Sequence, residues 1–332
     1  MFENFSQEYI LNNNKKRREK VSNFLETLNL SFDENTNITI NILDGKKIVA
    51  TASAEKNLIK CIGVDKNYRS KGLMNTLISE IIRYQYEKNI YDLSIITKIK
   101  NKDIIQSLGF ETICETKNII LMENNKNKFN KYLENISDNK LANVESSAIV
   151  MNLNPITKGH MFLIEKAAKE SQQVYIFIVS EDKSKVPFKT RLKLAKEGTK
   201  HLENVKIIEG GDYIISSQTF PTYFSKNVDE WINNYCDLDL KLFGKYIAKK
   251  LNIRKRYVGK EPYCELTSFY NKKMKEILPL YNIQITEVER LEQKQKAISA
   301  SLVRKLAEEG NISQIKELVP EATYKYYISK ED

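Results

Sequence analysis

The chain has 332 residues, which is enough for two domains that each bury a core of their own. Its formal net charge of +10 suits anionic partners such as nucleotides or an acidic protein, but no basic stripe interleaved with aromatic side chains indicates nucleic acid. Four widely spaced cysteines and two histidines argue against a His/Cys metal site and indicate a cytoplasmic protein with reduced thiols, and no apolar run is long enough to span a membrane.

The first part of the chain predicts a mixed α+β fold. Apolar residues at helical spacing predict a helix over residues 1–30, and alternation around Asp44-Gly45 predicts a hairpin over 38–54. The elements expected next are a strand over 58–64, a helix over 75–87, a strand over 93–97, a short helix over 104–108 and a strand over 119–122. We therefore place an N-terminal helical segment at 1–30 and an α+β domain at 31–125.

The turn before the helix over 75–87 carries a second signal. A strand that feeds a glycine-containing turn into a helix, with Leu108-Gly109-Phe110 later, resembles the GCN5-related N-acetyltransferase fold, whose R/Q-x-x-G-x-G/A turn holds the pyrophosphate of acetyl-CoA. Arg69 and Gly72 match that turn, whereas Met74 stands at its last small position and Ile105 stands where the family has a general-acid tyrosine. The resemblance implies an acetyltransferase-like domain, and the two departures favour docking or binding over acetyl transfer.

Residues 126–143 read as a linker rich in Lys, Asn and Ser, with one amphipathic helical pattern. The polar stretch before residue 144 leads into a strand, so we expect a second domain over 144–332. There the strands expected over 148–151, 174–180, 205–209, 256–259 and 283–288 alternate with helices, which is typical of a Rossmann-like α/β domain with a parallel sheet.

The first strand of this second domain is followed by a candidate phosphate site. Asn152, Asn154 and Pro155 break the strand, and Thr157 is a natural N-cap that puts Gly159 and His160 in the first turn of a helix. Free N–H groups at a helix N-terminus bind anions, glycine lets a phosphate approach, and a histidine can donate to it. The alternative is an ordinary strand–turn–helix with a surface histidine.

Two later segments bear on that choice. Ligands of parallel sheets bind outside the carboxyl ends of the strands, where Lys185 follows the second strand and Gly259 ends the fourth. Ser299 and Ser301 can cap a late helix that carries Arg304 one turn in. A capped helix with an arginine is common in proteins, so this third segment gains meaning only together with the others.

The combination of T-x-G-H, S-K-x-P-F and I-S-x-S-x-x-R, in that order, resembles the nucleotidyltransferase superfamily that contains pantetheine-phosphate adenylyltransferase. Ala300 stands where that family's last motif has a second serine. The chain as a whole is similar to the citrate lyase ligase family, in which an acetyltransferase-like domain precedes a nucleotidyltransferase domain. The stretches that carry this similarity are NPITKGH, KEGT, GDYIIS, TFPTYF, RYVGKEP, RLEQ and ISASLVR.

That resemblance implies that ATP activates acetate as acetyl-adenylate and that a thiol then takes the acetyl group. The thiol belongs to the CoA-like prosthetic group on the acyl carrier subunit of citrate lyase, so neither nucleic acid nor a membrane is expected as a partner. Catalytic roles fall on His160, Lys185, Arg304 and Thr157, and nucleotide binding falls on Asn152, Asn154, Gly159, Gly259, Ser299 and Ser301. Mg²⁺ is expected on the phosphates, with no protein ligand assigned.

Other interpretations stay open at this point. An adenylyltransferase acting on a phosphopantetheine-like substrate would use the same site, an acetyltransferase would use acetyl-CoA without ATP, and a nucleotide-binding regulator would catalyse nothing. Segments 213–224 and 260–270 are the candidates for an acetate pocket, because they interrupt a regular sheet pattern. We also hypothesise that the N-terminal domain holds the carrier subunit or its prosthetic arm, because the turn at Arg69 suits an anion.

Overall fold

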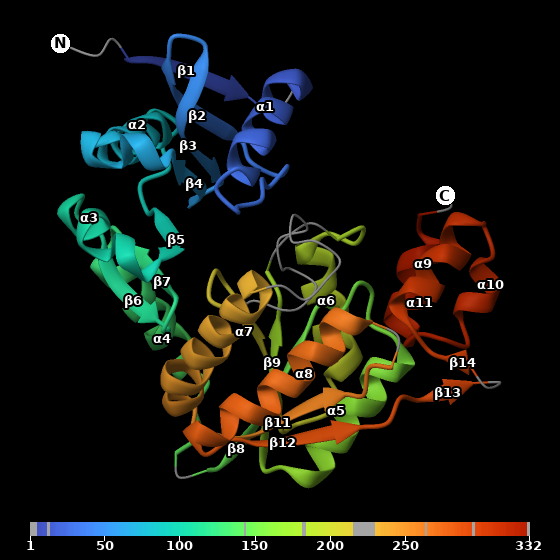
Figure 1. Ribbon diagram of the computed structural model, residues 1–332. Helices are drawn as coiled ribbons and strands as arrows, with labels where there is room; N and C mark the ends of the chain where they lie inside the picture. The colour runs from blue at the N-terminus through green and yellow to red at the C-terminus, as the bar shows by residue number, and fades with distance from the viewer. Residues whose placement is uncertain are drawn as a thin grey trace. The chain divides into compact units, whose positions relative to one another are not determined.

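The computed structural model describes residues 5–11, 14–142, 144–180, 184–214, 230–262, 264–293 and 296–330. The described chain forms two compact units, each with its own sheet and core (Figure 1). The first unit takes its described residues from 1–131 and 221–238, and the second takes them from 132–220 and 239–332. None of the helices in the described part is long and apolar enough to cross a membrane.

The described strands of the first unit form one sheet in the order β1-β2-β3-β4-β5-β7-β6. Its strands are β1 Phe5–Leu11, β2 Ile38–Asp44, β3 Lys47–Glu55, β4 Leu58–Val64, β5 Ser94–Lys98, β6 Glu111–Glu115 and β7 Ile119–Glu123. The sheet is antiparallel except where β4 meets β5, and there the parallel pairing is confined to Leu58 with Ser94 and Ile59 with Ile95. Beyond these pairs β4 and β5 are not paired, which leaves room between them.

The helices of the first unit cover this sheet. They are α1 Lys15–Glu26, α2 Leu73–Glu87 and α3 Lys102–Ser107. Leu77, Ile78 and Ile81 of α2 are fully buried against the strands and form the apolar face of this helix. Gly72, before α2, has φ +69°, a left-handed conformation that glycine adopts without strain. The α+β fold predicted for this half, including its hairpin, is confirmed.

One prediction for the first unit is wrong, and one strand was not predicted. Residues 5–11 are not helical, since β1 pairs antiparallel with β2 along its whole length and the helix starts only at Lys15, capped by the Asn14 side chain. Phe5, Tyr9 and Ile10 have high β-propensity, and hydrogen bonds to a neighbouring strand outweigh a weak helical pattern. Strand β6 was not expected, because its five residues ETICE carry no clear apolar alternation.

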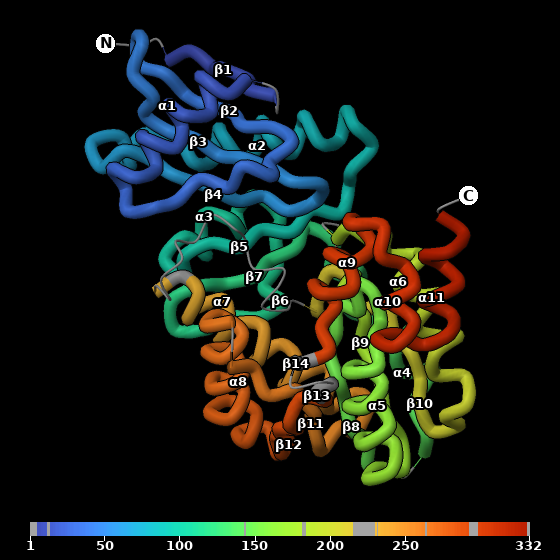
Figure 2. Tube along the Cα trace, turned by 90° about the vertical axis from the view of Figure 1, so that its right-hand side faces the viewer, coloured from blue at the N-terminus to red at the C-terminus, as the bar shows by residue number. Residues whose placement is uncertain are grey.

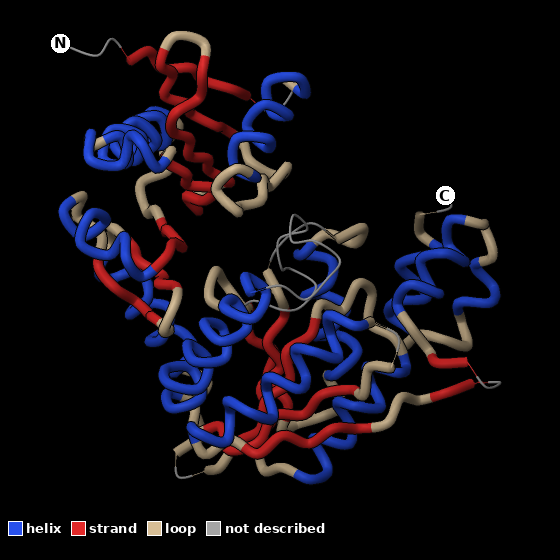
Figure 3. Tube along the Cα trace, in the orientation of Figure 1, coloured by secondary structure: helices blue, strands red, loops and turns tan. Residues whose placement is uncertain are grey.

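The second unit holds a five-stranded parallel sheet in the order β10-β9-β8-β11-β12, which confirms the predicted Rossmann-like fold (Figure 3). Its strands are β8 Ser146–Met151, β9 Gln173–Ile178, β10 Val205–Glu209, β11 Ile253–Gly259 and β12 Gln284–Val288. The strand order reverses between β8 and β11, and the carboxyl ends of strands beside such a reversal are where ligands bind.

Helices pack on both faces of this sheet. The helices of the second unit are α5 Lys158–Glu170, α6 Phe188–Thr199, the π-helix Phe243–Ala248, α8 Glu265–Ile277, α9 Ala300–Glu308, α10 Ile312–Ile315 and α11 Glu321–Ile328, whereas α7 Glu230–Leu242 is divided between the two units after residue 238. Tyr257 of β11 reaches Glu170 of α5 on one face, whereas Phe177 of β9 packs on Phe243 on the other. Helices α9, α10 and α11 pack together, and α11 also packs on α6 (Figure 2).

The sequence analysis did not predict α7, α8, α10, α11 or the two-residue strands β13 Glu292–Gln293 and β14 Lys296–Ala297. Residues 265–270 of the predicted segment 260–270 are therefore the start of a regular helix. Of the predicted segment 213–224, only Tyr213 and Ile214 lie within the described residues. Helix α4, Lys126–Ser137, contains the predicted amphipathic pattern, and the two units divide inside it, between residues 131 and 132. The proposed domain boundaries after residues 30, 125 and 143 stay predictions.

Candidate functional site

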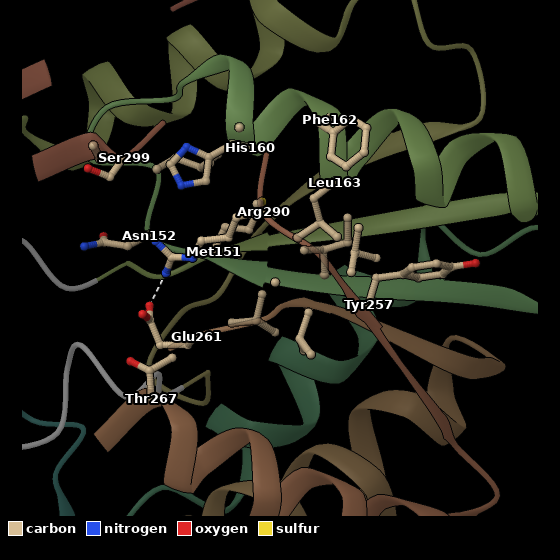
Figure 4. A pocket seen from close by; sticks show the side chains of 18 of the residues that line it. Met151, Asn152, His160, Phe162, Leu163, Tyr257, Glu261, Thr267, Arg290 and Ser299 are labelled. Atoms are coloured by element: carbon tan, nitrogen blue, oxygen red, sulfur yellow. Dashed lines mark hydrogen bonds and ion pairs between the residues drawn. The ribbon is translucent and has the colours of Figure 1, made fainter. Parts of the chain in front are cut away.

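A cavity of about 770 Å³ lies at the carboxyl ends of β8 and β11 in the second unit (Figure 4). Its walls come from the turn after β8, the first turn of α5, the end of β11, helix α8 and the start of α9. The cavity therefore sits where the strand order reverses, as the sequence analysis expected for a ligand site. Among the predicted site residues, those that line it are Asn152, Asn154, Gly159, His160, Gly259, Ser299, Ser301 and Arg304.

Thr157 and His160 form a reciprocal cap at the start of α5. The backbone N–H of His160 donates to the Thr157 hydroxyl at 3.3 Å, and the backbone N–H of Thr157 donates to His160 Nδ1 at 3.0 Å. Because Nδ1 accepts this bond, the neutral imidazole carries its proton on Nε2. Thr157 itself is buried and does not line the cavity, so its hydroxyl serves the cap.

His160 is held in its neutral form. Burial of the ring and, to a smaller extent, the positive charge of nearby Arg290 lower its pKa to about 4. At neutral pH the side chain is thus a hydrogen-bond donor without a charge. The N–H groups of Lys158 and His160 already donate to Leu318 and Thr157, so the His160 side chain adds to the N–H of Gly159 and to the positive dipole end of α5, which together favour an anion.

Gly159 has a structural role that the sequence did not reveal. A Cβ added at this position would lie 2.9 Å from the carbonyl oxygen of Ile298, closer than real Cβ atoms come to an oxygen. The segment that enters α9 therefore touches the first turn of α5. Glycine was expected to let a phosphate approach, and in the structure it lets another part of the chain approach.

The start of α9 forms the second polar wall of the cavity. The Ser299 hydroxyl accepts from the N–H of Leu302 at 3.2 Å and lies 2.9 Å from the Ser301 hydroxyl, so Ser299 is the N-cap. Arg304, one turn in, donates to the backbone carbonyl of Asn154. The two helix N-termini expected to bind phosphates thus face one cavity, and Arg304 links α9 to the turn after β8.

Lys185 is not part of this cavity wall. It forms an ion pair with Glu308 at the end of α9, and both side chains are more than half exposed. The segment that carries Lys185 is nevertheless fixed to the site, since the N–H of Val186 donates to Asn154 Oδ1 at 3.0 Å and Asn152 Nδ2 donates to Ser184 at 3.1 Å.

Arg191 of α6, which was not among the predicted site residues, stabilises the turn after β8 through hydrogen bonds. Its guanidinium is fully buried and donates to the carbonyls of Val186, Asn152 and Val179 at 3.1, 2.8 and 2.8 Å. It also donates to Asn152 Oδ1 at 2.7 Å. Both predicted asparagines therefore hold the turn after β8 in shape besides lining the cavity.

The opposite wall also contains residues that were missed. Arg290 forms an ion pair with Glu261, which the dashed line in Figure 4 marks, and it donates to the backbone carbonyl of Lys260 at 2.9 Å. An added Cβ at Gly259 would meet nothing within 4 Å, so this residue leaves the cavity open. Arg290 and Glu261 lie within the stretches RLEQ and RYVGKEP, which carried the family resemblance without an assigned role.

Carboxylates are present at the cavity but already have partners. Glu261 pairs with Arg290, and Glu289 pairs with Lys260 at 2.8 Å. Among the residues that the structure describes, no three His, Cys, Asp or Glu side chains are grouped as they would be around a metal ion. A cation in this cavity would thus depend on oxygen ligands from the substrate.

The fold and the cavity define a class: a Rossmann-like α/β domain with a cavity at its strand ends, where two helix N-termini meet, joined to an α+β unit. The family described as "Citrate lyase ligase C-terminal domain" matches residues 146–327, more than half of the chain. The chain belongs to the citrate lyase ligase family, as its sequence predicted.

Individual relatives agree with this assignment. The chain is 34% identical over 317 residues to the citrate (pro-3S)-lyase ligase of Escherichia coli (strain K12), covering 94% of this chain and 90% of that protein. For the same ligase of Klebsiella pneumoniae the identity is 32%, over 94% of this chain and 93% of that protein. Among solved structures, Escherichia coli ElaA is similar with a TM-score of 0.34 and 14% identity, covering 37% of this chain and 100% of that one.

Proposed function

We propose that this enzyme uses ATP to activate acetate and then acetylates the thiol of the CoA-like prosthetic group on the acyl carrier subunit of citrate lyase. Membership of the citrate lyase ligase family supports the partner. The observation that carries the chemistry is the convergence of two capped helix N-termini, at His160 of α5 and Ser299 of α9, on one cavity.

In the first step, an acetate oxygen attacks the α-phosphorus of ATP, and the bond between that phosphorus and the bridging oxygen of pyrophosphate breaks. Two anions must approach, so donors that meet the phosphoryl oxygens lower the barrier. His160 would donate from Nε2, the N–H of Gly159 would contact the same oxygens, and Arg304 would stabilise the leaving pyrophosphate. Mg²⁺ would be held by the phosphates and would neutralise part of their charge.

In the second step, the carrier's thiolate sulfur attacks the carbonyl carbon of the acetyl-adenylate, and AMP leaves with the electrons of the broken C–O bond. A mixed anhydride is reactive enough for this step without a covalent intermediate on the enzyme. We therefore assign no nucleophile in this chain. Gly259, at the open end of β11, would lie beside the nucleotide base or ribose.

Product analysis tests this proposal against the two alternatives. Thiol-form carrier, ATP and acetate should yield free AMP, pyrophosphate and a carrier heavier by one acetyl group. AMP retained on the product would instead indicate an adenylyltransferase. Acetylation that needs acetyl-CoA and no ATP would indicate an acetyltransferase.

We also propose that the first unit binds the phosphate-bearing prosthetic arm of the carrier. A cavity of about 280 Å³ lies where β4 and β5 separate, and Arg69, Lys98 and Lys100 line it together with Met74. Burial and then the positive charge of Lys100 lower the pKa of Lys98, with a smaller contribution from Arg69, while the carboxylate of Glu230 raises it, so the cations outnumber the acidic groups here. Such a cluster suits a polyanion.

Substitution of these cations tests the second proposal. Arg69→Ala combined with Lys98→Ala should raise the KM for the carrier at least about tenfold, because charge-assisted hydrogen bonds are lost. Acetate-dependent ATP–pyrophosphate exchange, which needs no carrier, should be unchanged. Lys66→Ala, in the same turn and exposed, is the matched control. An unchanged KM for the carrier in the double variant would contradict the proposal.

A further inference from the structure

A buried arginine lies in the wall of the main cavity and takes no part in the chemistry described above. Arg256 of β11 is only 3% exposed, and it lines the cavity in the second unit. Its neighbour Tyr257 points to the α5 face of the sheet. Because side chains alternate along a strand, Arg256 lies on the other face, toward the π-helical segment and α8.

Aromatic rings fix the plane of this guanidinium. Its central carbon lies 4.6 Å from the ring centroid of Phe243 and 5.9 Å from that of Tyr270. Such stacking occupies the faces of the group and leaves its N–H donors, which lie in the plane, for other partners. Phe243 opens the π-helix Phe243–Ala248, a rare conformation that recurs at functional sites.

The donors of Arg256 are not satisfied by the described part of the chain. Its Nε and Nη1 atoms are buried, and no acceptor among the described residues reaches either of them. Burying a charged donor without a partner is costly, and the cost is offset when an anion binds beside it. A guanidinium and a carboxylate match in shape, since two parallel N–H groups meet two oxygens.

We propose that Arg256 binds the carboxylate of the acid substrate. The proposed function assigns the triphosphate to the N-termini of α5 and α9, so a separate buried cation suits a separate, small anion. Apolar surface accompanies it: Val258, on the same face of β11, and Met274 of α8 also line the cavity and would receive a methyl group. This inference rests on the proposed function and adds the site that recognises the acid.

Arg256→Met separates this role from a structural one. The variant loses the contacts with the rings of Phe243 and Tyr270, but methionine also packs on aromatic rings and no described residue loses a hydrogen bond. Because apolar residues often replace buried charges without cost, its melting temperature without ligand should be unchanged or higher. Its KM for acetate in ATP–pyrophosphate exchange should rise at least about tenfold, while its KM for ATP stays within about twofold. Arg254→Met, exposed and two residues earlier on the same strand, should change neither value.

A folded Arg256→Met enzyme with the acetate KM of the wild type would overturn the proposal. If that variant does not fold, Arg256→Lys decides, because lysine keeps the charge and loses the planar pair of donors. An increase in the acetate KM supports the site, and an unchanged value overturns it. Equilibrium dialysis with radiolabelled acetate distinguishes failure of this proposal from failure of the proposed function. If the wild type binds acetate, Arg256→Met does not, and neither catalyses ATP–pyrophosphate exchange, then adenylation alone is refuted.

Discussion

The backbone at Gly159 and the carbonyl of Ile298 are in such close contact that a Cβ on Gly159 would lie 2.9 Å from that oxygen. The contact joins the first turn of α5 to the segment that enters α9. It therefore sets the distance between the two helix N-termini that face the cavity, although no motif connects them in the sequence.

Gly159→Ala should push these two segments apart. We expect a loss of about 1–3 kcal/mol in the free energy of unfolding, because overpacking forces the backbone to shift. We also expect a marked fall in the rate of acetate-dependent ATP–pyrophosphate exchange. Urea denaturation and exchange kinetics measure both. Gly198→Ala in α6 is the matched control, since its added Cβ would make only ordinary contacts at 3.5 and 3.7 Å. Equal behaviour of the two variants would contradict this account.

His160→Ala should reduce acetate-dependent exchange by roughly 10²–10³-fold, the usual effect of removing one donor to a transition-state oxyanion. The KM for ATP should change far less. The chain has only one other histidine, His201, which is exposed, so His201→Ala should keep the wild-type rate. If both variants were equally active, His160 would have no part in stabilising the transition state.

The pKa of His160 also predicts a dependence of stability on pH. Its value in the folded protein is about 4, below its usual 6.5, so between these values the unfolded chain binds the proton and the folded protein does not. The contribution of the neutral His160 side chain to the free energy of unfolding is complete above pH 6.5. It falls by on the order of 2 kcal/mol as the pH decreases toward 4. Urea denaturation of wild type and His160→Gln at pH 7 and 4.5 should show it as a difference between the two proteins. The same pH dependence in both would be the contrary result.

Arg191→Met should destabilise the protein by about 2–4 kcal/mol, because three buried carbonyls lose their donor at once. The turn after β8 should also lose its shape, so exchange activity should fall even at temperatures where the variant is folded. Lys193→Met, exposed on the same helix, should alter neither property. A stable and fully active Arg191→Met enzyme would show that the turn after β8 keeps its conformation without Arg191.

Lys185 and Glu308 offer a test of the phosphate role proposed for Lys185. Their ion pair is exposed, and such pairs contribute little to stability. If Lys185 moves to a phosphate when ATP binds, Lys185→Ala should lower the exchange rate at least about tenfold, and Glu308→Gln should retain or raise it. A similar loss of activity in both variants would indicate that the ion pair itself matters.

The local motifs were predictable because their physics is local. An apolar run followed by breakers and a threonine cap predicted β8, its turn and α5, and serine caps predicted α9. The parallel sheet followed from the alternation of strands and helices. In each of these cases, the residues that determine the structure lie within a few positions of one another.

What the sequence could not predict depends on distant packing. Arg191 carries no local motif, and the stretches that contain Arg256 and Arg290 gave neither residue a role, so each becomes a site residue only because other elements bury it or pair with it. The contact at Gly159 needs residue 298 to be folded against it. Strand β1 was mistaken for a helix because its partner β2 starts 27 positions after β1 ends, at Ile38 against Leu11.

The most direct measurement of the central claim is ATP–pyrophosphate exchange by the purified enzyme with acetate and without any carrier. The account predicts exchange that depends on acetate, saturates with it and disappears in His160→Ala. The contrary result has two parts: the enzyme shows no exchange with acetate, and after addition of thiol-form carrier it releases AMP without acetylating the carrier. That result would contradict the formation of an acetyl-adenylate in this cavity.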